Sequence, residues 1–185
     1  STRTHAATEK IAQGSSAAAP QAADFQILIV PRHPQRFDEV HALIEQHGLS
    51  VSRRTSWGAE PQAADVWLGD SLGEMALYYA MSDVALLGGS FAPLGGQNLI
   101  EAAAVGCPVI MGPHTFNFAE VAELAEAAGA ARRGEDMAAA VRSARAMLSR
   151  PPARHAASEA GLRFAAKHRG AAVNTAKSLA GWLKS

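Results

Sequence analysis

Short apolar runs alternate with amphipathic stretches along most of this chain, and this alternation limits the fold more than any other feature. The run Phe25–Val30, FQILIV, is apolar and rich in β-branched residues, which is typical of a strand buried on both faces in a parallel sheet. The other predicted strands are 49–54, 66–68, 84–89 and 107–111, and the predicted helices are 36–48, 72–81, one from about 98, and 117–128. Strands that alternate with helices through short connections predict an α/β fold, a doubly wound, Rossmann-like parallel sheet.

The pattern changes after Glu135, where the sequence predicts helices without strands up to residue 185, divided by Pro151 and Pro152. A chain of 185 residues, 48% of them hydrophobic, is long enough for one well-buried domain and too short for two comfortable ones. We therefore predict a single domain over residues 1–185, in which 135–185 form a helical tail. Residues 1–24 are expected to be an irregular lead-in or a weak helix around residues 5–18.

Charge and cysteine content exclude several classes of function. The 17 basic residues balance the 17 acidic ones, so we expect no broad electrostatic surface for nucleic acid or for an anionic membrane. The single cysteine, Cys107, excludes a disulfide framework and a multi-cysteine metal site, and it fits a reducing compartment such as the cytoplasm. No apolar run approaches the roughly 18 residues of a spanning helix and no apolar leader opens the chain, so we expect a soluble piece.

Three loops follow predicted strands directly. They are PRHP after Val30, GDSLGE after Leu68 and GGSFAPLGGQN after Leu87. In open α/β sheets, ligands bind beyond the carboxyl ends of the strands. We therefore expect these three loops to meet around one ligand.

Asn98 and Glu101 stand at the start of a predicted helix, behind the glycine pair Gly95-Gly96. The N-x-x-E spacing fits a capping box, in which the two side chains satisfy amides of the first helical turn. It equally fits a carboxylate that accepts hydrogen bonds from the hydroxyls of a ribose. The glycines would give a base or sugar the space it needs, and free amides at a helix start favour a nearby phosphate. The glycine pair favours the ligand interpretation.

Arg32 and Glu74 are the other charged candidates. A guanidinium at the end of a buried strand suits a phosphate, although Arg32 could equally bridge to a surface acid. Glu74 after Gly73 could bind a ligand or simply begin a helix, and His114 is expected to hold a turn. The histidines lack metal-ligand spacing, and neither a phosphate loop nor a strand-borne G-x-G-x-x-G is present, so neither a metal nor a dinucleotide is expected.

Several blocks together resemble one enzyme family: PRHPQRFDEV, GDSLGEMALYYAMSDVALLGGS and GGQNLIEAAAVGCPVIMGPHTFNFAEV. From about Phe25 to Ala131, the sequence is similar to the nucleotide-binding half of the 3-deoxy-D-manno-octulosonic acid (Kdo) transferases. The resemblance implies the carboxyl-terminal half of a GT-B type glycosyltransferase, which moves Kdo from CMP-Kdo to a lipid A precursor in lipopolysaccharide biosynthesis. It implies no metal and no other cofactor, with CMP-Kdo as the donor substrate.

The resemblance also implies a set of site residues. Glu101 would hold the ribose and Arg32 would lie by the nucleotide. The residues that would line the CMP site or shape the donor pocket are Pro31, Arg32, Gly73, Glu74, Met75, Ser90, Gly95, Gly96, Asn98, Leu99, Ile100 and Glu101. The sequence departs from the family at Gln97, where His is common, and at Ala102, where Pro is usual.

A further departure is that the family's acceptor-binding amino-terminal domain has no counterpart in this sequence. In the family that domain carries the general base and the membrane-associating surface. We therefore expect no catalytic residue in this chain and no activity of the isolated domain, and we expect the full enzyme at the cytoplasmic face of the bacterial inner membrane. Ser1-Thr2-Arg3 resembles the loop after the family's first strand. On that alignment a central strand is missing, and another chain or the terminus of this one would cover the gap.

Two alternatives remain open at the level of sequence. Another GT-B glycosyltransferase or a sugar-nucleotide epimerase with a UDP-sugar would use similar glycine loops and a similar ribose-binding Glu. A non-catalytic interaction domain would instead use its Ala-rich carboxyl-terminal helices to bind a partner.

Overall fold

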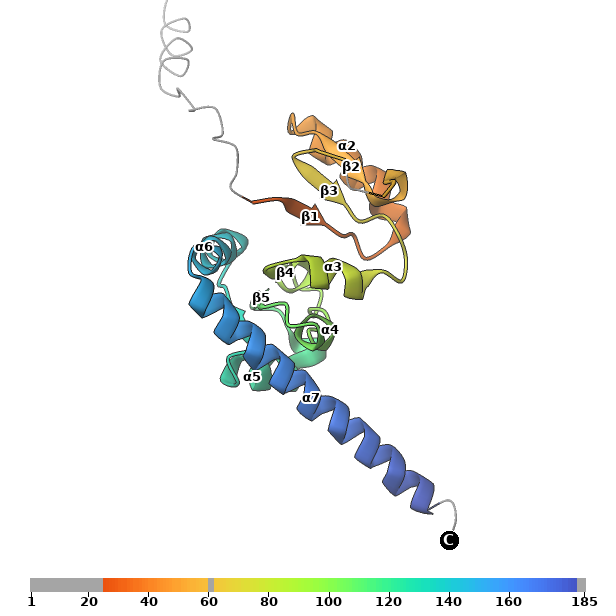
Figure 1. Ribbon diagram of the computed structural model, residues 1–185, viewed down its shortest axis with the longest axis vertical. Helices are drawn as coiled ribbons and strands as arrows, with labels where there is room; N and C mark the ends of the chain where they lie inside the picture. Colours follow the sequence, from red (N-terminus) through yellow and green to blue (C-terminus); the bar gives the residue numbers. More distant parts are fainter. Residues whose placement is uncertain (1–24, 60–61, 183–185) are drawn as a thin grey trace, which may run out of the picture. The chain divides into compact units, whose positions relative to one another are not determined.

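The computed structural model describes residues 25–59 and 62–182, with side chains up to residue 168. The helix predicted around residues 5–18 lies outside the described residues. The chain divides into two compact units, one ending at Asp70 and the other beginning at Ser71. We describe each unit by itself (Figure 1).

The first unit is a small parallel sheet with one long helix. Its strands β1 (Ile27–Ile29), β2 (Val51–Arg53) and β3 (Val66–Leu68) lie in the order β1-β3-β2, and both pairings are parallel. Between β1 and β2 the chain forms a 3-10 turn, η1 (Pro34–Arg36), and helix α2 (Phe37–Gln46), and a second 3-10 turn, η2 (Arg54–Ser56), follows β2. Val66 and Leu68 of the central strand are almost fully buried.

The expectation that the run 25–30 is buried on both faces is wrong for this strand. Phe25, Ile27 and Ile29 keep 37%, 40% and 37% of their surface exposed. The physical reason is position: among the described residues β1 pairs only with β3, so it is an outer strand of its sheet. The central strand proposed to be missing beside this sheet stays a prediction.

The second unit repeats the same alternation on a larger scale. Its strands β4 (Ala85–Leu87), β5 (Val109–Met111) and β6 (Ala131–Arg133) form a parallel sheet in the order β4-β5-β6. The helices are α3 (Met75–Met81), α4 (Ile100–Ala104), α5 (Ala119–Ala127), α6 (Met137–Leu148) and α7 (Pro151–Trp182), with 3-10 turns η3 (Gly88–Ser90) and η4 (Phe116–Phe118). The predicted α/β class is confirmed.

One feature of the second unit differs from the sequence-based expectation. Strand β6 was not predicted, because only Ala131 of its three residues is apolar and two arginines follow it.

The predicted division of the carboxyl-terminal helices at Pro151 and Pro152 is confirmed: α6 ends at Leu148 and α7 begins at Pro151. Proline is favourable at the start of a helix, because the first backbone amides there have no partner within the helix.

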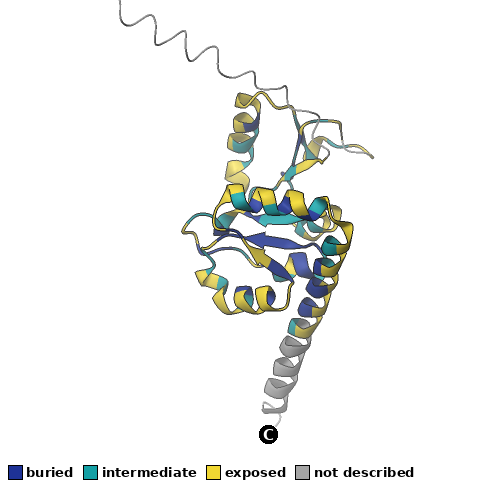
Figure 2. Cartoon of the chain, turned by 90° about the vertical axis from the view of Figure 1, so that its left-hand side faces the viewer, coloured by how far each residue is buried: buried dark blue, intermediate teal, exposed yellow. Residues whose placement is uncertain are grey.

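The core of the second unit lies on β5 and between α4 and α7. All three residues of β5 are buried (Figure 2). Small residues bring α4 and α7 together: a Cβ placed on Gly161 would lie 3.5 Å from the Cα of Ala103. Phe164 and Ala165 of α7 join Ala102 and Ala103 of α4 in one apolar cluster. This packing fixes the back of the short helix that carries Glu101.

Candidate functional site

The glycine-rich loop after β4 packs directly on the loop that follows β5. The amide of Asn117 donates to the carbonyl of Gly95 at 3.1 Å. Gly95 and Gly96 have φ of 88° and 83°, in the left-handed region that favours glycine. A Cβ on Gly95 would lie 2.1 Å from Nδ2 of Asn117, and one on Gly96 would lie 3.2 Å from a main-chain oxygen of the same neighbouring loop. The glycine pair is therefore needed for loop–loop packing, beyond any space it gives a ligand.

Ser90 links the ends of β4 and β5 from inside the protein. Its side chain is fully buried, and its Oγ donates to the carbonyl of Leu87 at 2.5 Å while accepting from the amide of Gly112 at 2.7 Å. The carbonyl of Ser90 accepts from the amide of His114 at 2.9 Å, so the main chain of His114 helps to hold this turn. Ser90 thus shapes the region through the backbone it positions.

Glu101 stands in the first turn of α4 with its side chain exposed. The capping-box alternative does not form: Oδ1 of Asn98 accepts from the amide of Ile100 at 3.0 Å. Within the described part of the second unit, no hydrogen bond or ion pair holds the Glu101 carboxylate. Leu99 is a core residue, 1% exposed, so it can meet a ligand only through its backbone.

Tyr79 on α3 lies near Glu101. Burial raises the pKa of Tyr79 to about 12, and the negative charge of Glu101 acts in the same direction. Its hydroxyl therefore stays protonated at neutral pH and can act as a hydrogen-bond donor. Burial also raises the pKa of the Cys107 thiol to about 12, and Cys107 is 2% exposed, so this cysteine belongs to the core.

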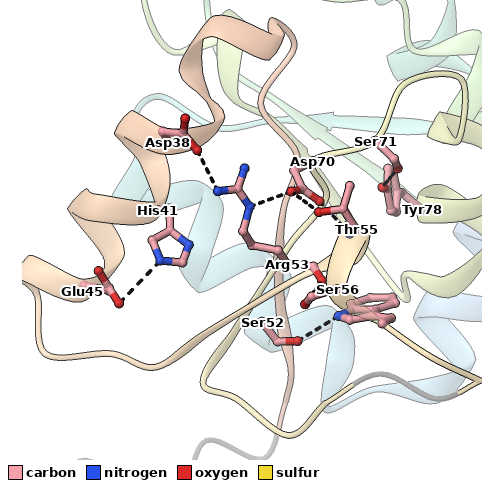
Figure 3. Close-up of polar contacts among 11 residues, drawn as sticks. Asp38, His41, Glu45, Ser52, Arg53, Thr55, Ser56, Asp70, Ser71 and Tyr78 are labelled. Carbon is pink, nitrogen blue, oxygen red and sulfur yellow. Dashed lines mark hydrogen bonds and ion pairs between the residues drawn. The ribbon is translucent and has the colours of Figure 1, made fainter.

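Glu74 directly precedes α3 and is held by two hydroxyl groups. Its Oε2 accepts from Oγ of Ser71 and, at 3.5 Å, from Oη of Tyr78. The hydroxyls of Ser71 and Tyr78 are also hydrogen-bonded to each other, and Figure 3 shows these two side chains side by side. Tyr78 is 2% exposed, which keeps this cluster in place. Gly73, with φ of 79°, provides the turn that brings the chain into the helix, and Met75 begins it.

In the first unit, Pro31 and Arg32 follow β1 at its carboxyl end. Arg32 is exposed. Among the described residues, no carboxylate forms an ion pair with Arg32, so the surface-bridge alternative is not seen there.

A buried carboxylate that the sequence analysis missed joins the carboxyl ends of β2 and β3. Asp70, with its side chain 2% exposed, accepts from Nε of Arg53 at 2.6 Å and from the amide and hydroxyl of Thr55 at 2.9 and 2.7 Å. Arg53 also donates to Asp38 at 2.7 Å, so its guanidinium lies between two acids (Figure 3). Burial alone would raise the pKa of Asp70, but the hydrogen bonds from Thr55 and Arg53 outweigh it and leave the pKa lowered.

The predicted site residues are thus distributed over both units. Pro31 and Arg32 belong to the first, and whether the three loops meet around one ligand stays a prediction. The second unit contains Gly73, Glu74, Met75, Ser90, Gly95, Gly96, Asn98, Leu99, Ile100 and Glu101. Within that unit, α3 and α4 are in contact and the glycine loop follows the carboxyl end of β4. Within residues 25–59 and 62–182, no three His, Cys, Asp or Glu side chains gather as metal ligands would.

Parallel strands with flanking helices and a glycine-rich loop at the carboxyl end of a strand define an α/β domain of the Rossmann-like class. The chain matches no protein-family model. It is 54% identical over 158 residues to the 3-deoxy-D-manno-octulosonic acid transferase of Bordetella pertussis, covering 85% of this chain and 37% of that protein. It is 38% identical over 146 residues to the transferase of the same name from Haemophilus influenzae, covering 78% of this chain and 34% of the relative.

A solved structure is similar as well. The C-terminal CMP-Kdo binding domain of WaaA from Acinetobacter baumannii superimposes with a TM-score of 0.70 at 33% identity, over 74% of this chain and 72% of that one. The chain belongs to the 3-deoxy-D-manno-octulosonic acid transferase family, which confirms the resemblance seen in the sequence. It spans a little over a third of the length of the two curated relatives, 37% and 34%.

Proposed function

We propose that this chain is the donor-binding half of a glycosyltransferase that moves Kdo from CMP-Kdo to a lipid A precursor in lipopolysaccharide biosynthesis. Family membership supports the proposal, and so does the similarity to a domain described as CMP-Kdo binding. The observation that carries it is Glu101. Its carboxylate is exposed in the first turn of α4, behind a glycine loop locked to its neighbour, and has no partner among the described residues of its unit.

In this proposal, Glu101 accepts hydrogen bonds from the vicinal hydroxyls of the ribose. Arg32 lies by the phosphate, where a guanidinium can offer paired hydrogen bonds. The hydroxyl of the acceptor attacks the anomeric carbon of Kdo as CMP leaves, with inversion. The domain orients the donor and stabilises negative charge on the departing phosphate. The proton of the acceptor hydroxyl passes to a carboxylate of an acceptor-binding domain, so the 185-residue chain alone transfers no sugar.

Two further parts of the proposal concern the whole protein. The reaction needs no metal or other cofactor, so the affinity for CMP is expected to be unchanged by EDTA. The lipid A precursor is bound by the acceptor-binding domain at the cytoplasmic face of the inner membrane, because an acceptor with acyl chains remains in the bilayer.

Calorimetric titration with CMP tests the donor site. Two hydrogen bonds to a charged group contribute about 1.5–3 kcal/mol each, so Glu101→Ala is expected to weaken CMP binding by at least about 100-fold. Glu120→Ala is the matched control, because Glu120 is also an exposed acid in the first turn of a helix, α5. Equal CMP affinity in the Glu101 and Glu120 variants would refute the ribose role.

Titration with UDP separates the enzyme classes. A site built for a nucleoside monophosphate leaving group should prefer CMP, whereas a UDP-sugar enzyme should prefer UDP. If neither nucleotide raises the melting temperature, the donor-site proposal is wrong and the interaction-domain alternative is favoured.

A further inference from the structure

The side chains of Ser71, Glu74 and Tyr78 form a chain of hydrogen bonds that runs in one direction. Oγ of Ser71 donates its proton to Oε2 of Glu74, so the bond between the two hydroxyls is donated by Tyr78. Oη of Tyr78 also lies 3.5 Å from the same carboxylate oxygen. The chain therefore begins at a tyrosine that is 2% exposed and ends on the carboxylate of Glu74. Hydrogen bonds arranged head to tail in this way strengthen one another.

The carboxylate of Glu74 does not serve the helix that it precedes. Glu74 is the residue immediately before α3, and its side chain makes no capping hydrogen bond to the first turn. The interpretation that Glu74 simply begins a helix therefore does not account for its side chain. Glu74 is half-buried, so the protein holds its carboxylate while a ligand can still reach it. Apart from its chain neighbours, no described residue would lie within 4 Å of a Cβ on Gly73, so this side of the turn is open.

Glu74 lies at a distance from Glu101 that suits one nucleotide. Helices α3 and α4 are in contact, and Tyr79 of α3 is close enough to Glu101 for the two side chains to interact electrostatically. Glu74 precedes Tyr79 by five residues, which is about 7.5 Å along a helix. This separation is comparable with that between the ribose hydroxyls and the amino group of the base in cytidine. One nucleotide is therefore long enough to contact both carboxylates.

We propose that Oε1 of Glu74 accepts a hydrogen bond from the exocyclic amino group of cytosine, and that Ser71 and Tyr78 are positioning residues that orient the carboxylate. This inference rests on the proposed donor site. CMP has two kinds of hydrogen-bond donor, the ribose hydroxyls and this amino group, and the ribose is assigned to Glu101. A carboxylate is a favourable partner for the cytosine amino group, whereas it repels the carbonyl oxygen that uracil has in the same place. Glu74 would thus select cytidine over uridine.

Calorimetric titration of the 185-residue chain with three nucleotides tests the contact without altering the protein. UMP has a carbonyl oxygen in place of the amino group, and 2-pyrimidinone riboside 5′-monophosphate has only a hydrogen there. A hydrogen bond to a charged group changes the affinity by about 10- to 150-fold, so both nucleotides should bind at least that much more weakly than CMP. Equal affinities for CMP and the pyrimidinone nucleotide would overturn the proposal.

Glu74→Gln tests the residue itself. The hydroxyls of Ser71 and Tyr78 would hold the amide oxygen, so the amide NH2 group faces the base, where it can donate to the uracil oxygen but not to the cytosine amino group. CMP should then bind about 10- to 150-fold more weakly, and UMP no more weakly than before. Glu120→Gln is the matched control, because it removes the same charge from an exposed position in the first turn of α5. It should keep the parent's ratio of the two affinities.

Ser71→Ala and Tyr78→Phe test the positioning role. Each removes one hydroxyl of the chain and should reduce the preference for CMP over UMP by about 2- to 12-fold, although Glu74 is still present. Thermal melting verifies that the variants are folded, and a loss of stability alone does not change the ratio of affinities of two ligands for one site. An unchanged ratio in both variants would show that these hydroxyls do not position Glu74.

The titrations separate this inference from the donor site on which it rests. If CMP binding depends on Glu101 but Glu74→Gln keeps the parent's ratio of CMP to UMP affinity, the cytosine contact is wrong and the donor site is retained. If the parent chain binds neither CMP nor UMP, the donor site is wrong and the cytosine contact is overturned with it.

Discussion

Replacing Gly95 by alanine should destabilise the second unit through two separate effects. At φ of 88° an L-residue is strained, which costs about 1–3 kcal/mol. The new Cβ would also lie 2.1 Å from Nδ2 and 2.5 Å from Cγ of Asn117, so the Asn117 side chain must swing away. That movement removes its hydrogen bond to the carbonyl of Leu94, which at 3.4 Å is weak and contributes at most about 1 kcal/mol. The expected total is about 2–4 kcal/mol.

Urea and thermal denaturation measure this loss. For a chain of this size, 1 kcal/mol corresponds to a change of about 2–4 °C in the melting temperature, so Gly95→Ala should melt about 4–16 °C lower. Gly88→Ala is the control within the same loop, because a Cβ there meets nothing within 4 Å and its φ is not positive. It should stay within about 0.5 kcal/mol of the parent.

A double variant separates strain from overlap. In Gly95→Ala with Asn117→Ala the clashing amide is gone, so stability should partly recover relative to Gly95→Ala alone. The backbone strain and the approach of the new Cβ to Cε2 of Phe116 at 2.8 Å remain. If Gly95→Ala is as stable as Gly88→Ala, the loop–loop packing described above is wrong.

Two further predictions concern titratable groups. Because the folded-state pKa of Asp70 is lowered, its contribution to the free energy of unfolding is present above the ordinary pKa of about 3.9 and is lost as pH falls through the folded pKa. Asp70→Asn should cost about 2–4 kcal/mol at pH 7 and flatten the acid limb of the stability profile in urea denaturation, and an unchanged limb would contradict the network around Asp70. Cys107, with its pKa raised to about 12, should react with Ellman's reagent at pH 8 only after unfolding, and rapid reaction of the native chain would show that the thiol is accessible.

Much of the fold is predictable because its signals are local. The apolar run at residues 107–111 predicts a strand, and β5 forms there with every residue buried. Strand β6 is not predictable in this way, since Ala131–Arg133 becomes a strand only by pairing with β5. The exposure of Ile27 and Ile29 likewise depends on which strands lie beside β1, and apolar composition does not contain that information.

Parts of the candidate site could likewise be predicted from neighbouring residues, whereas other parts depend on residues far apart in the sequence. The sequence singled out Glu101 but left its capping role open, and only the hydrogen bond from the amide of Ile100 to Asn98 decides that question. The Asp70 network was missed because its partners Arg53 and Thr55 are 17 and 15 residues away along the chain. The total charge of zero does not show that the segment from residue 131 onward is basic. That becomes clear only when charged residues are counted along the chain.

The close contact of Gly161 with Ala103 couples the position of α7 to that of α4. Within the same stretch of α7, Ala160 and Arg163 line a groove beside β6, and Gly161 contacts the back of α4, the helix that carries Glu101. Because only a glycine and an alanine lie between the two helix backbones, no flexible side chain can adjust if α7 is displaced toward α4. A bulky residue at position 161 would therefore displace α4 and with it Glu101, and under the proposed donor site it would change the affinity for CMP.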